Sequence, residues 1–452
     1  MRAATTVPGR PTVAFATLGC RLNQVDSETL ATRLEERGYR TVGFESAADV
    51  VVVNTCTVTA RAEVSDRQMI RRAARTHPRA RVVVTGCWAQ TDPGAVAALR
   101  EVDAVVGNAA KDQLPDVIGA LLAEERDTRL VTGRRTPRVV AGPMTEGALA
   151  GPPVPRPSRR ARAFVKVQEG CRHRCAFCVV PMARGTSRSV PPADVLAHAR
   201  RLVDLGYREI VLTGVDLGHY GADLAPRTTL AALLGRLIGL RGLRWVRLSS
   251  VLPAYVTPEL AALIEGSDAI APHLHLPLQS GSDRILRFMR RPYNVAMYRA
   301  VVERLAAARP GLGLGADVIV GFPGESEDDF AATLSLVEAL PFSYLHVFAY
   351  SDRPGTEAAG FPEHVDARTI GRRRAALRTL ANAKGAAFRR AMRGQIHDAI
   401  VLETRDRATG ALVGLTGNYV EVTFDGPDSW MRTVRRVCVT DVEAATPRGE
   451  AA

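Results

Sequence analysis

The stretch Cys171-Arg-His-Arg-Cys175-Ala-Phe-Cys178 decides the fold, because it places three cysteines within eight residues. It directly follows a segment with the pattern of a β-strand, Phe164–Gln168. Thiolates are the usual ligands of iron–sulfur clusters, and three of them leave one iron of a four-iron cluster open to a further ligand. A zinc site completed by His173 is an alternative, although structural zinc usually takes its ligands from two separated pairs. Buried core cysteines are the third interpretation.

Six short apolar runs alternate with helical patterns on either side of this triplet and beyond it. Such regular repetition predicts a whole or partial (β/α) barrel, and the site of a barrel lies at the carboxyl ends of its strands. The expected strands are Phe164–Gln168, Glu209–Thr213, Trp245–Leu248, His273–Leu276, Gly315–Val320 and Tyr344–Ala349.

The triplet spacing, with an aromatic residue before the last cysteine, resembles the radical-SAM superfamily. Three motifs follow in the order of that family: residues 213–218 after the second strand, 275–281 after the fourth, and 315–325 along the fifth. Each alone could be an ordinary βα turn. Together they imply that S-adenosylmethionine binds the open iron, with contacts from Phe177, Thr213, Gly214, Asp216, Ser249, Gln279, Ser280, Asp317, Gly321 and Phe348.

Three more cysteines, Cys20, Cys56 and Cys87, lie far apart in the first 125 residues. Each comes just after a predicted strand of a doubly wound parallel sheet, whose carboxyl ends share one edge. We therefore expect the three thiols to converge and hold a second cluster. Simple burial would explain one of these positions easily and all three poorly. The expected strands are Thr12–Ala16, Asp49–Asn54, Arg81–Thr85 and Asp103–Val106.

The rest of the chain changes in composition twice. Residues 126–160 are rich in proline and arginine and have the character of an extended basic linker, with a loop packed on the body as the alternative. A basic helix is expected over Ala367–Arg393, and short strands after it predict a small β-barrel. The expected domains are a doubly wound α/β domain at 10–125, the linker at 126–160, a partial (β/α) barrel at 161–390 and the β-barrel at 391–445.

The composition suits a cytoplasmic protein with an acidic partner. The formal net charge is +13, which makes nucleic acid the first candidate, although a solvated helix face is also compatible with it. The start of the chain has no secretory signal pattern and no apolar run is long enough to span a membrane. Seven cysteines in a reduced compartment favour metal or catalytic roles, apart from Cys438, which is expected in the core of a strand.

Nearly the whole chain resembles the methylthiotransferase branch of the radical-SAM enzymes, through residues 18–23, 54–56, 85–87, the triplet, 275–281, 317–325 and 350–356. The tail is similar to a TRAM domain, an RNA-binding barrel. This resemblance implies two [4Fe-4S] clusters and two molecules of S-adenosylmethionine. One molecule methylates a sulfur held at the cluster of Cys20, Cys56 and Cys87. The other is cleaved at the cluster of Cys171, Cys175 and Cys178 to a radical that removes a C–H hydrogen from the substrate.

Within this branch, residues 18–23, 54–59, 213–218 and 247–253 resemble the enzymes that act on N6-threonylcarbamoyladenosine at position 37 of tRNA. Leu252 departs from their pattern, which has an acidic residue there. The alternatives are isopentenyladenosine tRNA, an aspartate of a ribosomal protein, or a non-catalytic iron–sulfur protein that binds RNA or senses redox state. The expected partners are the anticodon stem-loop of tRNA and a reductant such as flavodoxin or ferredoxin, with neither DNA nor membrane.

Overall fold

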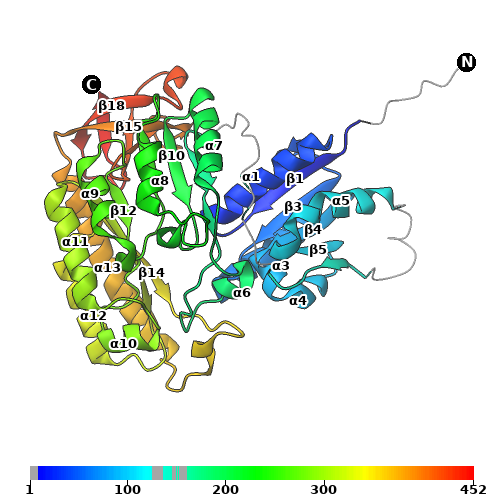
Figure 1. The fold of residues 1–452 in the computed structure, drawn as a ribbon, viewed down its shortest axis with the longest axis horizontal. Helices are drawn as coiled ribbons and strands as arrows, with labels where there is room; N and C mark the ends of the chain where they lie inside the picture. Colours follow the sequence, from blue (N-terminus) through cyan, green and yellow to red (C-terminus); the bar gives the residue numbers. More distant parts are fainter. Residues whose placement is uncertain (1–8, 125–135, 145–148, 150, 152–159) are drawn as a thin grey trace, which may run out of the picture. The chain divides into compact units, whose positions relative to one another are not determined.

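The computed structural model describes residues 9–124, 136–144, 149, 151 and 160–452 (Figure 1). Most of the expected linker at 126–160 lies outside these residues. Contacts divide the chain into two compact units. The first contains residues 1–147 and 178–186, and the second contains residues 148–177 and 187–452.

The first unit is built on a six-stranded sheet in which every pair is parallel, in the order β2-β1-β3-β4-β5-β6. The strands are β1 (Thr12–Thr17), β2 (Arg40–Val42), β3 (Val50–Thr55), β4 (Arg81–Gly86), β5 (Ala104–Gly107) and β6 (Arg138–Val140). The helices are α1 (Arg21–Glu36), α2 (Ala60–Thr76), α3 (Cys87–Thr91), α4 (Pro93–Ala97), α5 (Leu114–Ala123) and α6 (Val180–Arg184).

Both faces of this sheet are covered, as expected for a doubly wound fold. Alternate residues of β3 illustrate the rule, because Val51 and Val53 pack in a cluster with α2 and α3, whereas Val50 and Val52 pack with α1 and α5. All six residues of β3 are buried, which accounts for its continuous apolar run in the sequence. The polar groups of this unit are therefore left to the ends of the strands.

The second unit contains a partial barrel of six parallel strands. They form two three-stranded sheets, β11-β10-β7 and β12-β13-β14, and single bridges such as Ser250 to His275 connect them. The strands are β7 (Ala163–Lys166), β10 (Glu209–Thr213), β11 (Trp245–Leu248), β12 (His273–His275), β13 (Gly313–Val320) and β14 (Tyr344–Ala349), with a short antiparallel pair β8 (Gln168–Glu169) and β9 (Arg188–Ser189).

Helices lie along the outer side of these strands (Figure 1). They are α7 (Pro192–Asp204), α8 (Leu230–Leu237), α9 (Pro258–Gly266), α10 (Asp283–Phe288), α11 (Val295–Ala308), α12 (Glu327–Ala339) and α13 (Ala367–Ala391). One large core joins helices and strands. The expectation of a partial (β/α) barrel is confirmed.

The chain ends in a closed five-stranded barrel with the order β15-β16-β17-β19-β18. Its strands are β15 (Ile396–Arg405), β16 (Leu412–Thr416), β17 (Glu421–Phe424), β18 (Val434–Asp441) and β19 (Arg448–Ala451). Its core includes Val422, Phe424 and Val437. The expected small β-barrel is confirmed.

Four strands were not expected, one of them the two-residue β9. β2 is a short strand on the sheet edge, and β19 follows residue 445, where the sequence analysis ended the last domain. β6 lies in the stretch interpreted as linker and pairs with β5, so the first sheet extends past residue 125. Among the described residues, no helix is long and apolar enough to cross a membrane.

Candidate iron–sulfur sites

The three cysteines of the first unit stand at the carboxyl ends of neighbouring strands. Cys56 directly follows β3, Cys87 directly follows β4, and Cys20 precedes α1 in the turn after β1. Cys56 and Cys87 are buried and Cys20 is exposed. Burial, with smaller contributions from the nearby sulfurs of Cys87 and Cys20, raises the pKa of the Cys56 thiol to about 12. The three sulfurs are therefore close enough to interact electrostatically.

Glycines allow the backbone to come together at this edge. Gly19 has a φ of +90°, and a Cβ placed there would lie 2.7 Å from the Cβ of Cys56. Gly86 has a φ of +102°, and its Cβ would lie 2.5 Å from the backbone nitrogen of Thr55. Any other residue would push the strands apart, which explains why glycine precedes two of the three cysteines.

Asparagine side chains hold the cysteine turns in place. The amide of Asn23 donates to the backbone oxygens of Leu18 at 2.7 Å and Thr55 at 2.8 Å. The amide nitrogen of Asn108 lies 3.8 Å from the sulfur of Cys87 and also donates to a backbone oxygen of α6. Hydrogen bonds of this kind to a ligand sulfur influence the properties of a bound cluster.

A buried group of charges lies next to these turns. The carboxylate of Asp26 forms ion pairs with Arg184 at 3.0 Å and with Lys111 at 2.6 Å. Arg184 also donates a hydrogen bond to the side-chain oxygen of Asn23 at 2.6 Å. Arg184 is 2% exposed. Two cations facing one carboxylate leave an excess of positive charge close to Asn23 and the Cys87 turn, which suits an anionic group.

The donor set therefore fits an iron–sulfur cluster. The three thiols that would provide its ligands follow neighbouring strands, an amide N–H points at one sulfur, and two cations lie beside the turns. A raised thiol pKa is the expected state of such a site without metal, since iron binding replaces the proton. A carboxylate oxygen of Asp66 accepts a hydrogen bond from the backbone N–H of Cys56 at 3.0 Å. Burial raises the pKa of this carboxyl to about 7.

Two cysteines of the triplet belong to the second unit, and Cys178 belongs to the first. In the second unit, Arg291 points a guanidinium nitrogen at the sulfur of Cys175 from 3.1 Å. The sulfur of Cys171 lies 3.8 Å from a carboxylate oxygen of Asp216. Burial raises the pKa of Asp216 to about 6, against the opposing effects of Cys171 and Arg291. Thiolates beside a guanidinium also fit a cluster.

His173, which the zinc interpretation would use, is already engaged. Its Nε2 lies 2.8 Å from the hydroxyl of Tyr255 and 3.5 Å from Asp216. Burial lowers the pKa of His173, and the positive charges of Arg291 and His219 lower it further. The ring is neutral at physiological pH and oriented by Tyr255.

The residues expected to contact S-adenosylmethionine divide into two groups. Thr213 ends β10, Gly214 and Asp216 follow it directly, and Gln279 lies four residues beyond β12. A Cβ at Gly214 would lie 2.9 Å from the amide oxygen of Gln168. Ser249 has a buried hydroxyl without a hydrogen-bond partner among the described residues. The structure therefore does not place this oxygen where a ligand could reach it without a rearrangement.

The second group has contacts within the protein. The Ser280 hydroxyl is fully buried, 3.3 Å from that of Thr333. The N–H of Gly321 donates to Glu325 at 2.7 Å. Phe177 packs edge-on against Phe322 in a small core cluster. Phe348, in contrast, is 43% exposed, and Asp317 pairs with His275 at 3.1 Å.

The sequence analysis named Asp317 as an expected contact and His275 within a motif, but it did not single out His346. His275, Asp317 and His346 bring one ligand atom each within 4.8 Å of one another, on β12, β13 and β14. The hydroxyl of Tyr344 joins His275 to His273, at 3.0 and 2.9 Å. In the first unit, Asn108, Lys111 and Arg184 were also missed. Their only signal was that Lys111 is one of very few lysines in the chain.

Comparison with known proteins adds a family to this geometry. Residues 12–107 match uncharacterized protein family UPF0004, and residues 165–337 match the radical SAM superfamily. Among solved structures, a radical S-adenosylmethionine methyltransferase, TsrM, from Kitasatospora setae has a TM-score of 0.57 at 19% identity, covering 77% of this chain and 74% of that one. At that identity the likeness supports the fold. The superfamily match implies a [4Fe-4S] cluster and S-adenosylmethionine as cofactors.

Relatives by sequence cover almost the whole chain. Threonylcarbamoyladenosine tRNA methylthiotransferase MtaB of Aquifex aeolicus is 40% identical, covering 92% of this chain and 97% of the relative. The protein of that name in Bacillus subtilis is 37% identical over 97% and 95%. A tRNA-2-methylthio-N(6)-dimethylallyladenosine synthase of Moorella thermoacetica is 34% identical over 98% and 99%. This chain therefore belongs to the radical-SAM methylthiotransferase family, as an enzyme close to MtaB.

Proposed function

We propose that this enzyme converts N6-threonylcarbamoyladenosine at position 37 of tRNA to its 2-methylthio derivative. The observation that carries the proposal is the identity of 37 to 40% to relatives named for that substrate, over 95% or more of the length of two of them. The relative named for dimethylallyladenosine is 34% identical, so the isopentenyladenosine tRNA is the second candidate.

We propose Cys171, Cys175 and Cys178 as ligands of the cluster that binds S-adenosylmethionine. A second cluster is assigned to Cys20, Cys56 and Cys87. When bound, the first supplies the electron that cleaves S-adenosylmethionine, and the second supplies the sulfur that is transferred with a methyl group. Two molecules of S-adenosylmethionine are used for each product.

The protein's own part is to orient these groups and to balance their charge. Arg291 places a positive charge against the sulfur of Cys175. Arg184 and Lys111 place positive charge beside the turn of Cys87, through Asp26 and Asn23. Each guanidinium is held by a second contact, since Arg291 also donates to the Tyr293 hydroxyl at 3.0 Å. Fixed cations of this kind favour an anionic cluster without moving during the reaction.

The tRNA substrate is proposed to bind through its anticodon stem-loop, in the cytoplasm, with flavodoxin or ferredoxin as reductant. Arginines of α13 and of the turn after it support an RNA contact, because Arg378 and Arg390 of the helix and Arg393 beyond it are exposed. The helix is not a uniform basic face, however. Arg373 is 2% exposed and pairs with the buried Glu325 at 2.7 Å, which is a structural role.

The test uses nucleosides from the source organism and the purified enzyme. Deleting the gene should remove the 2-methylthio form of threonylcarbamoyladenosine from tRNA, as measured by mass spectrometry. Loss of the 2-methylthio form of isopentenyladenosine instead would identify the second candidate, and unchanged tRNA would favour a ribosomal-protein target.

Purified protein separates an enzyme from a redox sensor. Anaerobic reconstitution should give about eight irons per chain if both sites hold four-iron clusters. Dithionite and S-adenosylmethionine should then release 5′-deoxyadenosine. Cys171→Ala should abolish this release, whereas Cys20→Ala should keep it and lose methylthio transfer. Unimpaired product from Cys20→Ala would refute the second cluster, and clusters without any release would favour the sensor.

A further inference from the structure

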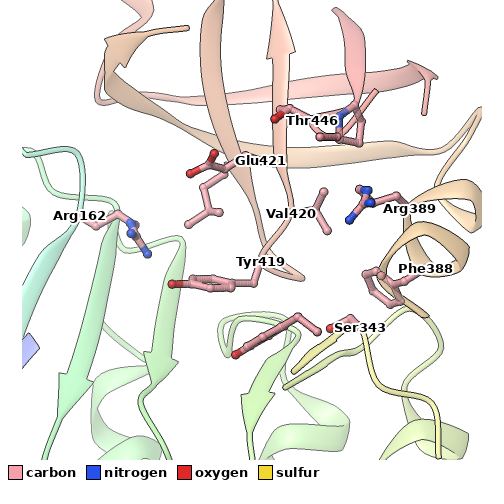
Figure 2. Close-up of a pocket in the computed structure, with 13 residues that line it drawn as sticks. Arg162, Ser343, Phe388, Arg389, Tyr419, Val420, Glu421 and Thr446 are labelled. Atoms are coloured by element: carbon pink, nitrogen blue, oxygen red, sulfur yellow. The ribbon is translucent and has the colours of Figure 1, made fainter. Parts of the chain in front are cut away.

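A cavity of about 330 Å³ lies in the second unit, where the closed barrel meets α13 and the start of β14 (Figure 2). Its walls come from five separate stretches of the chain. The residues that give it chemical character are Arg162, Arg389, Tyr344, Tyr419, Phe388 and Glu421. The volume is at the small end for ligand sites, and would hold a single nucleotide.

Three charged side chains line the cavity, Arg162, Arg389 and Glu421. Figure 2 shows Arg162 and Arg389 entering from opposite sides, with Tyr419 between them. Arg162 is paired with Glu209 at 3.6 Å, so Arg389 is the cation on which a phosphate contact depends. The Nε of Arg389 is buried, so the donors that a ligand can reach are its terminal guanidinium nitrogens, which Figure 2 shows directed toward the cavity. A guanidinium fork is a common binding group for phosphate.

Aromatic faces provide the second half of the site. The rings of Tyr344 and Tyr419 lie 6.0 Å apart at 38°, and Phe388 adds a third ring. Tyr419 has a φ of 73°, which is uncommon for a bulky residue and carries strain. The Thr416 side chain and the Arg247 guanidinium hold the turn before it. Guanidinium groups beside aromatic rings are the combination that binds single-stranded nucleic acid, through phosphate contacts and base stacking.

We propose that this cavity binds one unpaired nucleotide of the RNA substrate, at a distance from the base that is modified. The phosphate is held by Arg389, and the base lies against the aromatic rings. The inference rests on the proposed function, because it takes tRNA as the partner. It adds an anchoring site that orients the RNA on the enzyme without contacting the reacting atoms.

Adjacent arginines of α13 provide a matched test. Arg389→Ala and Arg390→Ala each remove one positive charge from the same turn, but only Arg389 lines the cavity. The probes are a fluorescent anticodon stem-loop RNA and adenosine 5′-monophosphate, with affinities measured at fixed salt on the full-length enzyme. Arg389→Ala should weaken both by about tenfold, the usual effect of losing a hydrogen bond to a charged group. Arg390→Ala should change them less than about twofold.

Ultraviolet cross-linking gives a readout that general destabilisation would not produce. The RNA should cross-link to the peptide that contains Tyr419 in the wild type and in Arg390→Ala, and far less in Arg389→Ala. Equal losses of affinity in the two variants, or cross-links elsewhere only, would overturn the proposal. If Arg389→Ala weakened the binding of adenosine 5′-monophosphate but not that of the stem-loop RNA, the cavity would be a site for a free nucleotide, and the proposal would also be overturned.

These outcomes are distinct from failure of the proposed function. If the wild-type enzyme binds the stem-loop but neither variant differs from it, only the nucleotide site is refuted. If the wild type does not bind the stem-loop at all, tRNA as substrate is refuted as well.

Discussion

Arg247 offers the most stringent test of how the two barrels of the second unit are joined. It lies on β11 with its side chain fully buried, and its guanidinium pairs with Glu209 of β10 at 2.7 Å. The same group donates to the backbone oxygens of Gly417 at 2.9 Å and Thr416 at 3.4 Å, in the turn after β16. One side chain thus connects the parallel barrel to the closed one.

Arg247→Met should destabilise the second unit severely. The substitution keeps an apolar stem of similar length but leaves the Glu209 carboxylate, which is 0% exposed, with only the longer contact to Arg162 at 3.6 Å. Removing one partner of a buried ion pair costs about 3–5 kcal/mol. The contact to Arg162 lessens this cost, whereas the loss of a donor to two backbone oxygens adds to it, so a value within this range is expected.

The measurement is urea unfolding followed through Trp245, which is buried beside Ile400 of the closed barrel. Arg244→Met is the control, because Arg244 pairs with Asp398 at 2.7 Å in a half-exposed position, where about 0–1 kcal/mol is expected. A loss below about 1 kcal/mol for Arg247→Met, or a loss equal to that of the control, would refute the reasoning.

A double variant tests the cause of the effect. Combining Arg247→Met with Glu209→Leu removes the buried carboxylate, although it also takes from Arg162 its partner at 3.6 Å, and should restore part of the lost stability. No recovery would mean that the contacts to the closed barrel, and not the buried carboxylate, carry the effect.

Three further predictions concern the cluster, acid stability and RNA. Asn108→Ala removes the N–H near the Cys87 sulfur and should lower the reduction potential of the cluster there. The potential is measured by electron paramagnetic resonance in a Cys175→Ala background, and the protein that carries Cys175→Ala alone is the control. Burial alone would raise the pKa of Asp329, but hydrogen bonds, led by that from Arg284, hold it well below its usual range. As the pH falls, the Asp329 carboxyl is therefore protonated in the unfolded state before it is protonated in the folded state. Its contribution to the free energy of unfolding is present at neutral pH and is lost as pH falls below about 4. The stability gap between wild type and Asp329→Asn in urea should narrow over that range, and a constant gap would contradict the assignment. Finally, affinity for the stem-loop RNA should fall by about 0.7 log units per log unit of salt for each phosphate contacted, and a flat dependence would exclude such contacts.

The sequence was sufficient for the fold where apolar runs are continuous. β3 and β4 are fully buried, so their β-branched runs could not be mistaken. β6 was missed because its three residues, at 48% exposure for Val139, carry almost no pattern and sit among prolines and arginines. Short edge strands depend on pairing with a neighbour, and one sequence does not show that pairing.

The cysteines could be grouped from the sequence because each follows a strand of one parallel sheet. Their supporting residues could not. Arg184 reaches Asn23 across 161 positions in the chain, and nothing in either residue's local pattern predicts the contact. For Arg373 the sequence pattern was misleading, because it placed this residue on a basic helix expected to contact RNA. In the structure Arg373 is buried and paired with Glu325.

The contact between Arg247 and Gly417 also bears on how the chain is made. These residues are 170 positions apart, so the ribosome adds the second roughly ten to thirty seconds after the first. Until then the guanidinium of Arg247 lacks two of its hydrogen-bond acceptors, the backbone oxygens of Gly417 and Thr416. During synthesis, the parallel barrel therefore gains these contacts only after the C-terminal barrel has been added to the chain. A chain released before Gly417 is added would carry all six candidate cluster cysteines, but its Arg247 would lack these two acceptors.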